Sequence, residues 1–270
     1  MRDVSFGQYY PAESFVHKCD PRTKILILIA YIVAIFSAKN FWGLGVCALA
    51  FLTIVFASRI PLGKILRSIR GVAFLLIFTA LLNLFFYSKG EVLFKWKFIK
   101  ITKGGVYFTV FLAARLILLV AGSSLLTLTT TPVSLTDGLE SLLYPLKWIR
   151  FPVHELALIM SIALRFIPIL SDETGRIMNA QKARGADFET GGLIKRVKAV
   201  IPILVPLLIS SVRRADELGE AMDARCYAGS KTRTKYKKLK FGIRDLVAFL
   251  FAAVVLTGVI LLRVYLPKVV

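Results

Sequence analysis

The sequence contains little cysteine, histidine or acid for its length of 270 residues. Its three cysteines, Cys19, Cys47 and Cys226, are scattered without a pairing pattern or metal-ligand spacing, which argues against a disulfide framework. The two histidines, His17 and His154, are isolated, so neither indicates a metal site or a catalytic dyad. A glycine-rich phosphate loop is also missing. We therefore expect no catalytic site, no metal site and no cofactor bound by this chain.

Basic residues greatly outnumber acidic ones. The 36 lysines and arginines against 16 aspartates and glutamates give a formal net charge of +20. The chain is 57% hydrophobic with a mean hydropathy of +0.71, which is too apolar for an ordinary soluble fold. In a membrane protein such positive charge is expected in cytoplasmic loops, whereas nucleic-acid binding would need aromatic residues among the basic ones. These features predict a cell-membrane protein without a nucleic-acid partner, and the N-terminus shows no cleavable signal peptide.

Long apolar runs predict the membrane-spanning helices, each of which needs about 20 residues to cross the hydrocarbon core. Five runs reach or approach this length: residues 25–38, 41–57, 72–87, 106–131 and 246–262. The first is short and can span only if flanking polar side chains extend to the interface, or if the turn at Lys39 and Asn40 lies near it. Small residues in the second and fourth runs favour close packing. We expect an all-α, polytopic helical bundle.

Charged loops set the predicted orientation. The loop between the second and third runs carries Arg59, Lys64, Arg67 and Arg70 without an acidic residue, so it is expected in the cytoplasm. Residues 88–105 also contain several lysines, but alternation of the spans places them outside. This gives about four transmembrane helices in residues 1–131, cytosolic helices in residues 132–243 and a last transmembrane helix in residues 244–270.

Within residues 132–240, charged and apolar residues are mixed at helical spacing, which is typical of amphipathic helices. Thr136 or Asp137 can cap a first helix that ends before Pro145. The apolar stretch 199–212 is too short to be expected as a span, and it contains two prolines.

Two longer amphipathic helices follow in the same segment. One is expected from about residue 152, through Pro168, to residue 184. The other is expected from about residue 193 to residue 225, bent at Pro202 and Pro206.

Two tripeptides at the predicted ends of these helices are the candidate functional residues: Ala183, Arg184, Gly185 and Ala224, Arg225, Cys226. Gly185 can take the left-handed conformation that closes a helix. Small neighbours leave each guanidinium unobstructed, and its fixed fork of donors suits bidentate contact with carboxylates or carbonyls. The repeated pattern predicts two cytosolic docking points.

Simpler roles remain open for the charged residues. Arg184 and Arg225 can each be a cation that gains about 0.3 to 1 kcal/mol from the helix dipole. Arg115 lies inside the fourth apolar run, where a charge is costly, and it either has a specific role, pairs within the bundle or lies near a helix end. The basic run 231–240 is expected to contact anionic membrane lipid.

Several short motifs, taken together and in order, resemble the transmembrane T component (EcfT) of energy-coupling factor transporters, a type of ABC transporter. They are Asp-Pro-Arg-Thr-Lys at residues 20–24, Arg-Phe-Ile-Pro at 165–168 followed by Glu173, Gln-Lys-Ala-Arg-Gly-Ala-Asp at 181–187, and Glu-Ala-Met-Asp-Ala-Arg-Cys-Tyr at 220–227. Cys226 replaces the glycine or serine of the simplest form of the last motif, which leaves the helix end there open.

The resemblance implies a non-catalytic membrane subunit with long coupling helices. In that family the two Ala-Arg-small motifs dock into grooves on two ATPase subunits, which bind the ATP, so Arg184 and Arg225 are implied to do so here. The amphipathic helices would contact a small substrate-binding membrane subunit, the S component, in uptake of a vitamin or a metal ion. The alternative is a polytopic membrane enzyme or a conventional permease that holds its own substrate, but the spans offer almost none of the polar clusters that an enzyme needs.

Overall fold

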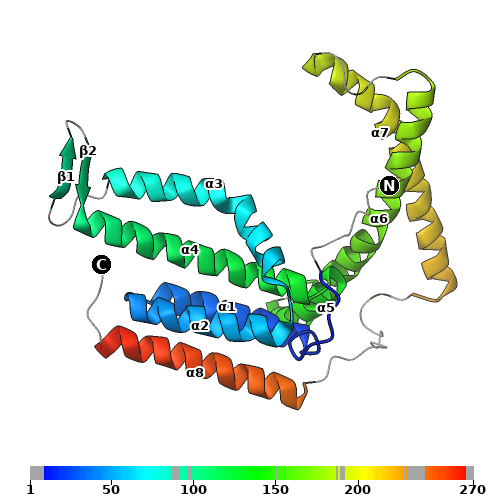
Figure 1. Cartoon of the computed structure of the whole chain (residues 1–270). Helices are drawn as coiled ribbons and strands as arrows, with labels where there is room; N and C mark the ends of the chain where they lie inside the picture. The colour runs from blue at the N-terminus through cyan, green and yellow to red at the C-terminus, as the bar shows by residue number, and fades with distance from the viewer. Residues whose placement is uncertain are drawn as a thin grey trace. The chain divides into compact units, whose positions relative to one another are not determined.

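The structure is a computed structural model that describes residues 9–86, 92–96, 99–149, 151–186, 188, 192–227, 229 and 241–265. Almost all of these residues are helical, which confirms the all-α prediction (Figure 1). The elements in chain order are α1 (Pro21–Ser37), α2 (Phe41–Ser58), α3 (Leu62–Phe86), β1 (Val92–Trp96), β2 (Ile99–Thr102), α4 (Lys103–Thr129), α5 (Pro132–Leu143), the 3-10 helix η1 (Tyr144–Ile149), α6 (Val153–Ala183), α7 (Leu193–Ala224) and α8 (Ile243–Tyr265).

The chain divides into two compact units. The first, called here the bundle unit, comprises Gly7–Leu142 and Leu239–Val270. The second, called the crossed-helix unit, comprises Leu143–Lys238 with Met1–Phe6.

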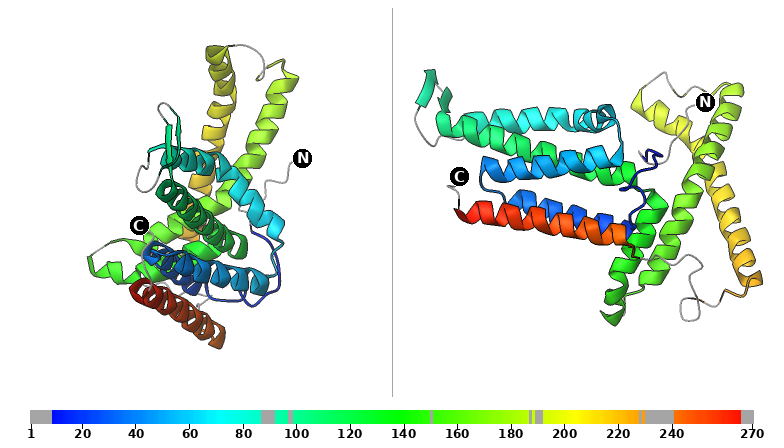
Figure 2. Two further views of the ribbon diagram at one scale, coloured as in Figure 1. Left: turned by 60° about the vertical axis from the view of Figure 1, so that its left-hand side comes forward. Right: turned by 60° about the horizontal axis from the view of Figure 1, so that its bottom comes forward.

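In the bundle unit, α8 packs against α1 and α2, and α4 packs against the same two helices from its own side (Figures 1 and 2). The last helix of the chain therefore lies beside the first two. Their contact faces are apolar, and Ile35, Cys47, Phe111 and Val259 are fully buried in the core. Burial of such side chains is the main favourable contribution to the packing of these helices in water, and close van der Waals contact serves the same end in lipid. The predicted helical bundle is confirmed.

One carboxylate joins the starts of α1 and α8. The side chain of Asp20 accepts a hydrogen bond from the Arg22 N–H at 2.9 Å and so caps α1. The N–H of Asp20 in turn donates to Oδ1 of the buried Asp245 at 2.8 Å. Oδ2 of Asp245 accepts from the Gly242 N–H at 2.8 Å, which is the second half of a capping arrangement for α8. Asp245 thus satisfies backbone donors at two helix starts.

Arg115 donates a hydrogen bond to a backbone carbonyl at the C-terminal end of α1. Its Nη2 donates to the carbonyl of Ala38 at 2.6 Å, and its guanidinium lies 4.7 Å from the ring centroid of Phe111. Because the last carbonyls of a helix have no intrahelical donor, the Ala38 carbonyl at the C-cap of α1 would otherwise need a donor among apolar surroundings. Beside it, Nδ2 of Asn40 donates to the Leu262 carbonyl of α8 at 3.1 Å. Arg115 lies in the middle of α4, so of the roles open from the sequence the structure shows pairing within the bundle, with a carbonyl at the end of α1 as the partner.

Glycines permit close helix contacts at two places. A Cβ added at Gly122 would stand 2.6 Å from Cε1 of Tyr31, so α1 and α4 could not approach this closely with any other residue there. At Gly43 it would stand 3.1 Å from the Cβ of Ala38. Gly45 faces open space. The predicted use of small residues for packing is therefore confirmed at Gly43 and Gly122.

The helices α3 and α4 form a long antiparallel pair joined through a small hairpin of β1 and β2 (Figure 1). Trp96 lies opposite Ile99 in this antiparallel ladder. The sequence analysis expected only a loop here and missed the strands, although lysines alternate with apolar residues around position 96 at the two-residue period of a strand. The side of the membrane on which residues 88–105 lie stays a prediction.

The predicted start of α5 was wrong. The helix already begins at Pro132, and Oγ1 of Thr131 accepts a hydrogen bond from the Ser134 N–H at 3.3 Å. Thr136 and Asp137, the predicted caps, therefore lie inside the helix. Proline is favoured at the first helical position because its missing N–H needs no partner there, and a threonine before it can cap. The predicted end of α5 was correct.

In the crossed-helix unit, α6 and α7 contact each other and cross, with their C-terminal ends pointing in opposite directions (Figures 1 and 2). Both helices begin and end within one residue of the bounds expected from the sequence. α7 bends in its N-terminal half, which contains Pro202 and Pro206, as predicted (Figure 1).

Within the described residues, five helices are long and apolar enough to cross a membrane: α2, α3, α4, α6 and α8. Four of them correspond to predicted spans, so the chain is a multi-pass membrane protein by helix length and composition. α1 is shorter than the other predicted spans, and its crossing of the membrane stays a prediction. α6 also qualifies, although the sequence analysis assigned it to a cytosolic segment.

Candidate functional site

The first arginine tripeptide closes α6 with a specific pattern of hydrogen bonds. Arg184 is the capping residue, and Gly185 follows with a φ of 87°. The Gly185 N–H donates to the Lys182 carbonyl at 3.0 Å, and the Ala186 N–H donates to the Gln181 carbonyl at 3.0 Å. This pair of bonds is the Schellman motif, which satisfies carbonyls that a helix end leaves without intrahelical partners.

The second tripeptide closes α7 in the same way. Arg225 is the capping residue, and Cys226 has a φ of 56°. The Cys226 N–H donates to the Asp223 carbonyl at 2.9 Å, and the Tyr227 N–H donates to the Met222 carbonyl at 3.1 Å. These are the same two bonds at the same relative positions. Cysteine therefore replaces glycine here without changing how the helix ends, which answers the point that the sequence left open.

The left-handed backbone at Cys226 carries strain that glycine would remove. A side chain in this conformation costs about 1 to 2 kcal/mol, and the greater freedom of glycine in the unfolded chain offsets part of the gain. We expect Cys226→Gly to stabilise the end of α7 by about 1 kcal/mol, which would slow local amide hydrogen exchange about fivefold. Gly185→Ala is the matched opposite change and should speed exchange at the end of α6. Unchanged exchange in both variants would contradict the conformations described for the two ends.

Both arginines project from their helix ends into solvent. Arg184 and Arg225 are exposed, and among the described residues neither side chain has a hydrogen-bond or ion-pair partner. The helix dipole stabilises a cation at this position by about 0.3 to 1 kcal/mol, but lysine would benefit equally. Two unpaired guanidinium groups at closed helix ends have the geometry to bind carboxylates or backbone carbonyls of another protein.

An exposed apolar stripe runs along the middle of α7, from Ile201 to Val212. Its members recur at helical spacing and are each more than half exposed: Ile201, Leu204, Val205, Leu208, Ile209 and Val212. α6 exposes Leu156, Ile159 and Met160 in its own N-terminal half. A continuous apolar face of this kind is unusual on a water-exposed surface and fits lipid or another membrane protein. Hydropathy alone identifies the apolar stretch 199–212, but only the structure shows that its side chains form one exposed face.

An ion pair joins α6 and α7, and the sequence analysis missed it. Nη2 of Arg214 lies 3.3 Å from Oε2 of Glu173, and the two residues are 41 positions apart. Glu173 was noted as part of a motif, but its partner was not identified. The point at which two helices cross is set by their packing, so spacing along one helix cannot reveal it.

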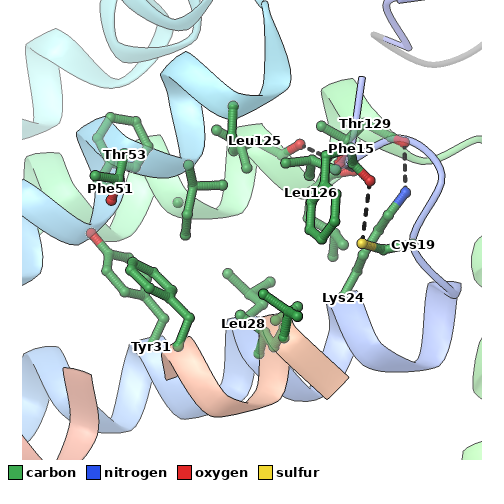
Figure 3. A pocket seen from close by; sticks show the side chains of 18 residues that line it. Phe15, Cys19, Lys24, Leu28, Tyr31, Phe51, Thr53, Leu125, Leu126 and Thr129 are labelled. Atoms are coloured by element: carbon green, nitrogen blue, oxygen red, sulfur yellow. Dashed lines mark hydrogen bonds between the residues drawn. The ribbon is translucent and has the colours of Figure 1, made fainter. Parts of the chain in front are cut away.

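The bundle unit contains a cavity of about 260 Å³ lined by α1, α2, α4 and α8 (Figure 3). Its walls are mostly aliphatic and aromatic, with Leu28 and Phe51 among them. At one end Nζ of Lys24 donates to the backbone carbonyl of Thr129 at 3.0 Å (Figure 3). It also donates to the His17 carbonyl at 3.2 Å, so this ammonium serves the fold. A water-soluble substrate would need several convergent polar groups. The cavity therefore does not favour a permease that holds its own substrate.

His17 takes part in local structure before α1. Its Nε2–H donates to the Tyr10 carbonyl at 3.0 Å, so Nδ1 accepts from the Ser14 hydroxyl at 2.7 Å. Burial lowers the pKa of His17 below its usual value, against the opposing effect of the Tyr10 carbonyl. The neutral ring is thereby favoured. In the part of the chain that the structure describes, no three His, Cys, Asp or Glu side chains gather to hold a metal ion.

Comparison with known proteins gives strong matches over almost the whole chain. The family described as cobalt transport protein matches residues 12–236. The energy-coupling factor transporter transmembrane protein EcfT of Ruminiclostridium cellulolyticum is 46% identical over 263 residues, which cover 97% of this chain and 98% of that protein. The protein of the same description in Clostridium kluyveri is 48% identical over 269 residues, covering 99% and 100%. That of Bacillus subtilis is 42% identical over 245 residues, covering 91% and 92%. These matches confirm the resemblance drawn from the motifs, and they are to transporter membrane components, as expected, rather than to enzymes.

Proposed function

The chain belongs to the family of energy-coupling factor transporter transmembrane proteins, and from this premise we propose that it couples ATP hydrolysis on two partner subunits to movement of a small substrate-binding membrane subunit. ATP would be bound by the two partner ATPases and not by this chain. The transported molecule would be a vitamin or a metal ion held by the small subunit.

The two matching helix ends carry this proposal. Each presents one exposed arginine, at Arg184 and Arg225, immediately before a residue in the left-handed conformation. That residue turns the chain away from the helix axis, so the last turn and its guanidinium are free to enter a groove on another protein. Two ATPase subunits of the same kind would need two docking points of the same kind. The ends of α6 and α7 meet that need, because both close in the Schellman motif and both carry an arginine at the C-cap.

The apolar stripe on α7 supports contact with the small membrane subunit. Its exposed members, from Ile201 to Val212, would be covered by a partner that is itself apolar. Because stripe and arginine lie on one continuous helix, movement of the docked end would be carried to the stripe. The coupling helices would lie on the cytoplasmic side, and the basic run 231–240, which lies outside the described residues, would contact anionic lipid.

Site-specific photocrosslinking tests these assignments. A photoreactive residue at Lys182 or Asp223, beside the two arginines, is expected to form crosslinks to ATPase subunits in intact membranes. The same residue at Leu208, in the stripe, is expected to crosslink to a small apolar membrane protein. Phe74, which is 82% exposed on α3, serves as the control and is expected to react with lipid. Crosslinks from Lys182 and Asp223 to lipid alone would contradict the docking role of the helix ends.

A further inference from the structure

The ion pair between Glu173 and Arg214 lies at equivalent positions along the two crossed helices. Glu173 precedes Arg184 by eleven residues, and Arg214 precedes Arg225 by eleven residues. At 1.5 Å per residue, each helical arm from the pair to its arginine is about 16 Å long. Eleven residues are also close to three helical turns, so each arginine lies on nearly the same face of its helix as the paired residue. The two docking ends are thus equidistant from one contact.

The pair also separates two chemically different parts of each helix. The exposed apolar residues lie on its N-terminal side, for example Met160 in α6 and Leu208 in α7. On its C-terminal side, neither arm exposes a large hydrophobic residue, and each arm ends in the docking arginine. The surface proposed for the membrane partner and the ends proposed for the ATPases therefore lie on opposite sides of the crossing.

The prolines of both helices lie on the N-terminal side as well. They are Pro168 in α6 and Pro202 and Pro206 in α7. A proline removes a helix hydrogen bond and permits a bend, whereas both C-terminal arms are continuous helix without proline. The pair therefore lies where the stiffer arm of each helix begins.

The surroundings of the pair favour a positioning role over a contribution to stability. The side chains of Arg214 and Glu173 are 35% and 27% exposed, and a partly exposed pair of this kind adds little to stability. Nε of Arg214 is shielded from solvent and has no hydrogen-bond partner among the described residues, so the contact of Nη2 with Glu173 at 3.3 Å is the hydrogen bond that the structure gives this guanidinium. A directional contact at a crossing opposes sliding and rotation of one helix past the other.

We propose that the Glu173–Arg214 ion pair is the fixed point of the α6–α7 crossing, so that displacement of one arginine-bearing end moves the other end and both apolar parts together. Glu173 and Arg214 are positioning residues that act through the helices and touch neither ATPase nor substrate. This inference rests on the proposed function, because only a coupling subunit needs its two docking ends to move as one body.

The test uses spin labels at Asn179 and Ala221, which are exposed and lie near the two helix ends. Cys226→Gly removes the exposed native thiol. Double electron–electron resonance, a pulsed electron paramagnetic resonance method, then gives the distribution of distances between the two spin labels in the purified full chain. The variants are Glu173→Gln, Arg214→Gln and the charge exchange Glu173→Arg with Arg214→Glu. Their controls are Asp172→Asn and Arg213→Gln, which change exposed charges at the neighbouring positions.

We expect a narrow distribution in the parent chain and in both controls, a broad one in each single variant, and recovery of the narrow one in the charge exchange. Recovery by exchange separates a positional role from general damage to the fold. An equally narrow distribution in the single variants would overturn the proposal. The distance measurement uses the chain without any partner, so it tests the role of the ion pair independently of ATPase binding. If the chain bound no ATPase, that result would contradict the proposed function, and the distance distributions would still test the role of the ion pair.

With the ATPases bound, a non-hydrolysable ATP analogue is expected to shift the distance in the parent complex and in the charge exchange. The shift should be lost or spread over a wide range in Glu173→Gln. The same shift in Glu173→Gln as in the parent complex would overturn the role of the pair in transmitting movement.

Discussion

Arg184→Ala combined with Arg225→Ala is expected to abolish assembly of the chain with both ATPase subunits. Each change removes a charge-assisted contact, and its loss costs about 2 to 5 kcal/mol when the contact is buried in a complex. Such a loss weakens binding by about 30-fold or more at each end. Arg184→Ala alone should release one ATPase and Arg225→Ala alone the other. Co-purification of the ATPases with each tagged variant measures the effect.

Charge alone should not restore this binding. Lysine at either position keeps the charge but lacks the planar fork, so we expect Arg184→Lys and Arg225→Lys to recover assembly poorly. Arg176→Ala is a suitable control because Arg176 is also exposed on α6, two turns before the helix end. A complete complex formed by the double alanine variant would show that the arginines are ordinary cations at helix ends.

Asp245→Leu is expected to destabilise the bundle unit by about 2 to 4 kcal/mol. The buried N–H of Asp20 would lose its acceptor, at a cost of about 1 to 3 kcal/mol. The Gly242 N–H, which is more accessible, would lose a cap worth about 1 kcal/mol. The free energy of unfolding in detergent, measured with a denaturant, tests this expectation.

An amide side chain at position 245 should lower the free energy of unfolding less than leucine does. Asp245→Asn keeps one acceptor oxygen, so about half of the destabilisation is expected. Asp137→Asn is the matched control, since Asp137 is exposed on α5. If Asp245→Leu were no more destabilising than this control, the joint between the starts of α1 and α8 would be disproved.

Local signals in the sequence predicted many of the helix boundaries, but α3 begins at Leu62, ten residues before the apolar run that indicated it, because its first turns carry the basic residues expected in a loop. The ends of α6 and α7 were found within one residue because glycine, small residues and charge mark a helix end. Apolar runs predicted the bundle because length and hydrophobicity are properties of a single segment. The start of α5 was misplaced because two possible capping residues inside the helix were preferred to Thr131, which precedes Pro132.

Contacts between distant segments were beyond the reach of the sequence. Asp245 and Asp20 are 225 residues apart, and nothing along the chain pairs them. Arg115 stood out as a charge in an apolar run, but its acceptor at Ala38 depends on how α1 packs against α4. The same holds for the ion pair between α6 and α7.

For the candidate site, too, some features could be predicted from the sequence and others only seen in the structure. Both arginine tripeptides were selected from spacing and from their small neighbours, and the helix end at Cys226 was left open, as was an ordinary role of each arginine as a helix-end cation. The structure adds that Cys226 takes the left-handed conformation of a glycine, with the same hydrogen bonds as at Gly185. A single sequence shows which residue departs from a pattern, but not whether the backbone accommodates it at the cost of strain.

The composition of the complex purified from native membranes tests the central claim most directly. The tagged chain, extracted in mild detergent and analysed by native mass spectrometry, is predicted to carry two ATPase subunits and one small, highly apolar membrane protein. Recovery of the chain without any ATPase, from membranes in which it supports uptake, would contradict its role as a coupling subunit.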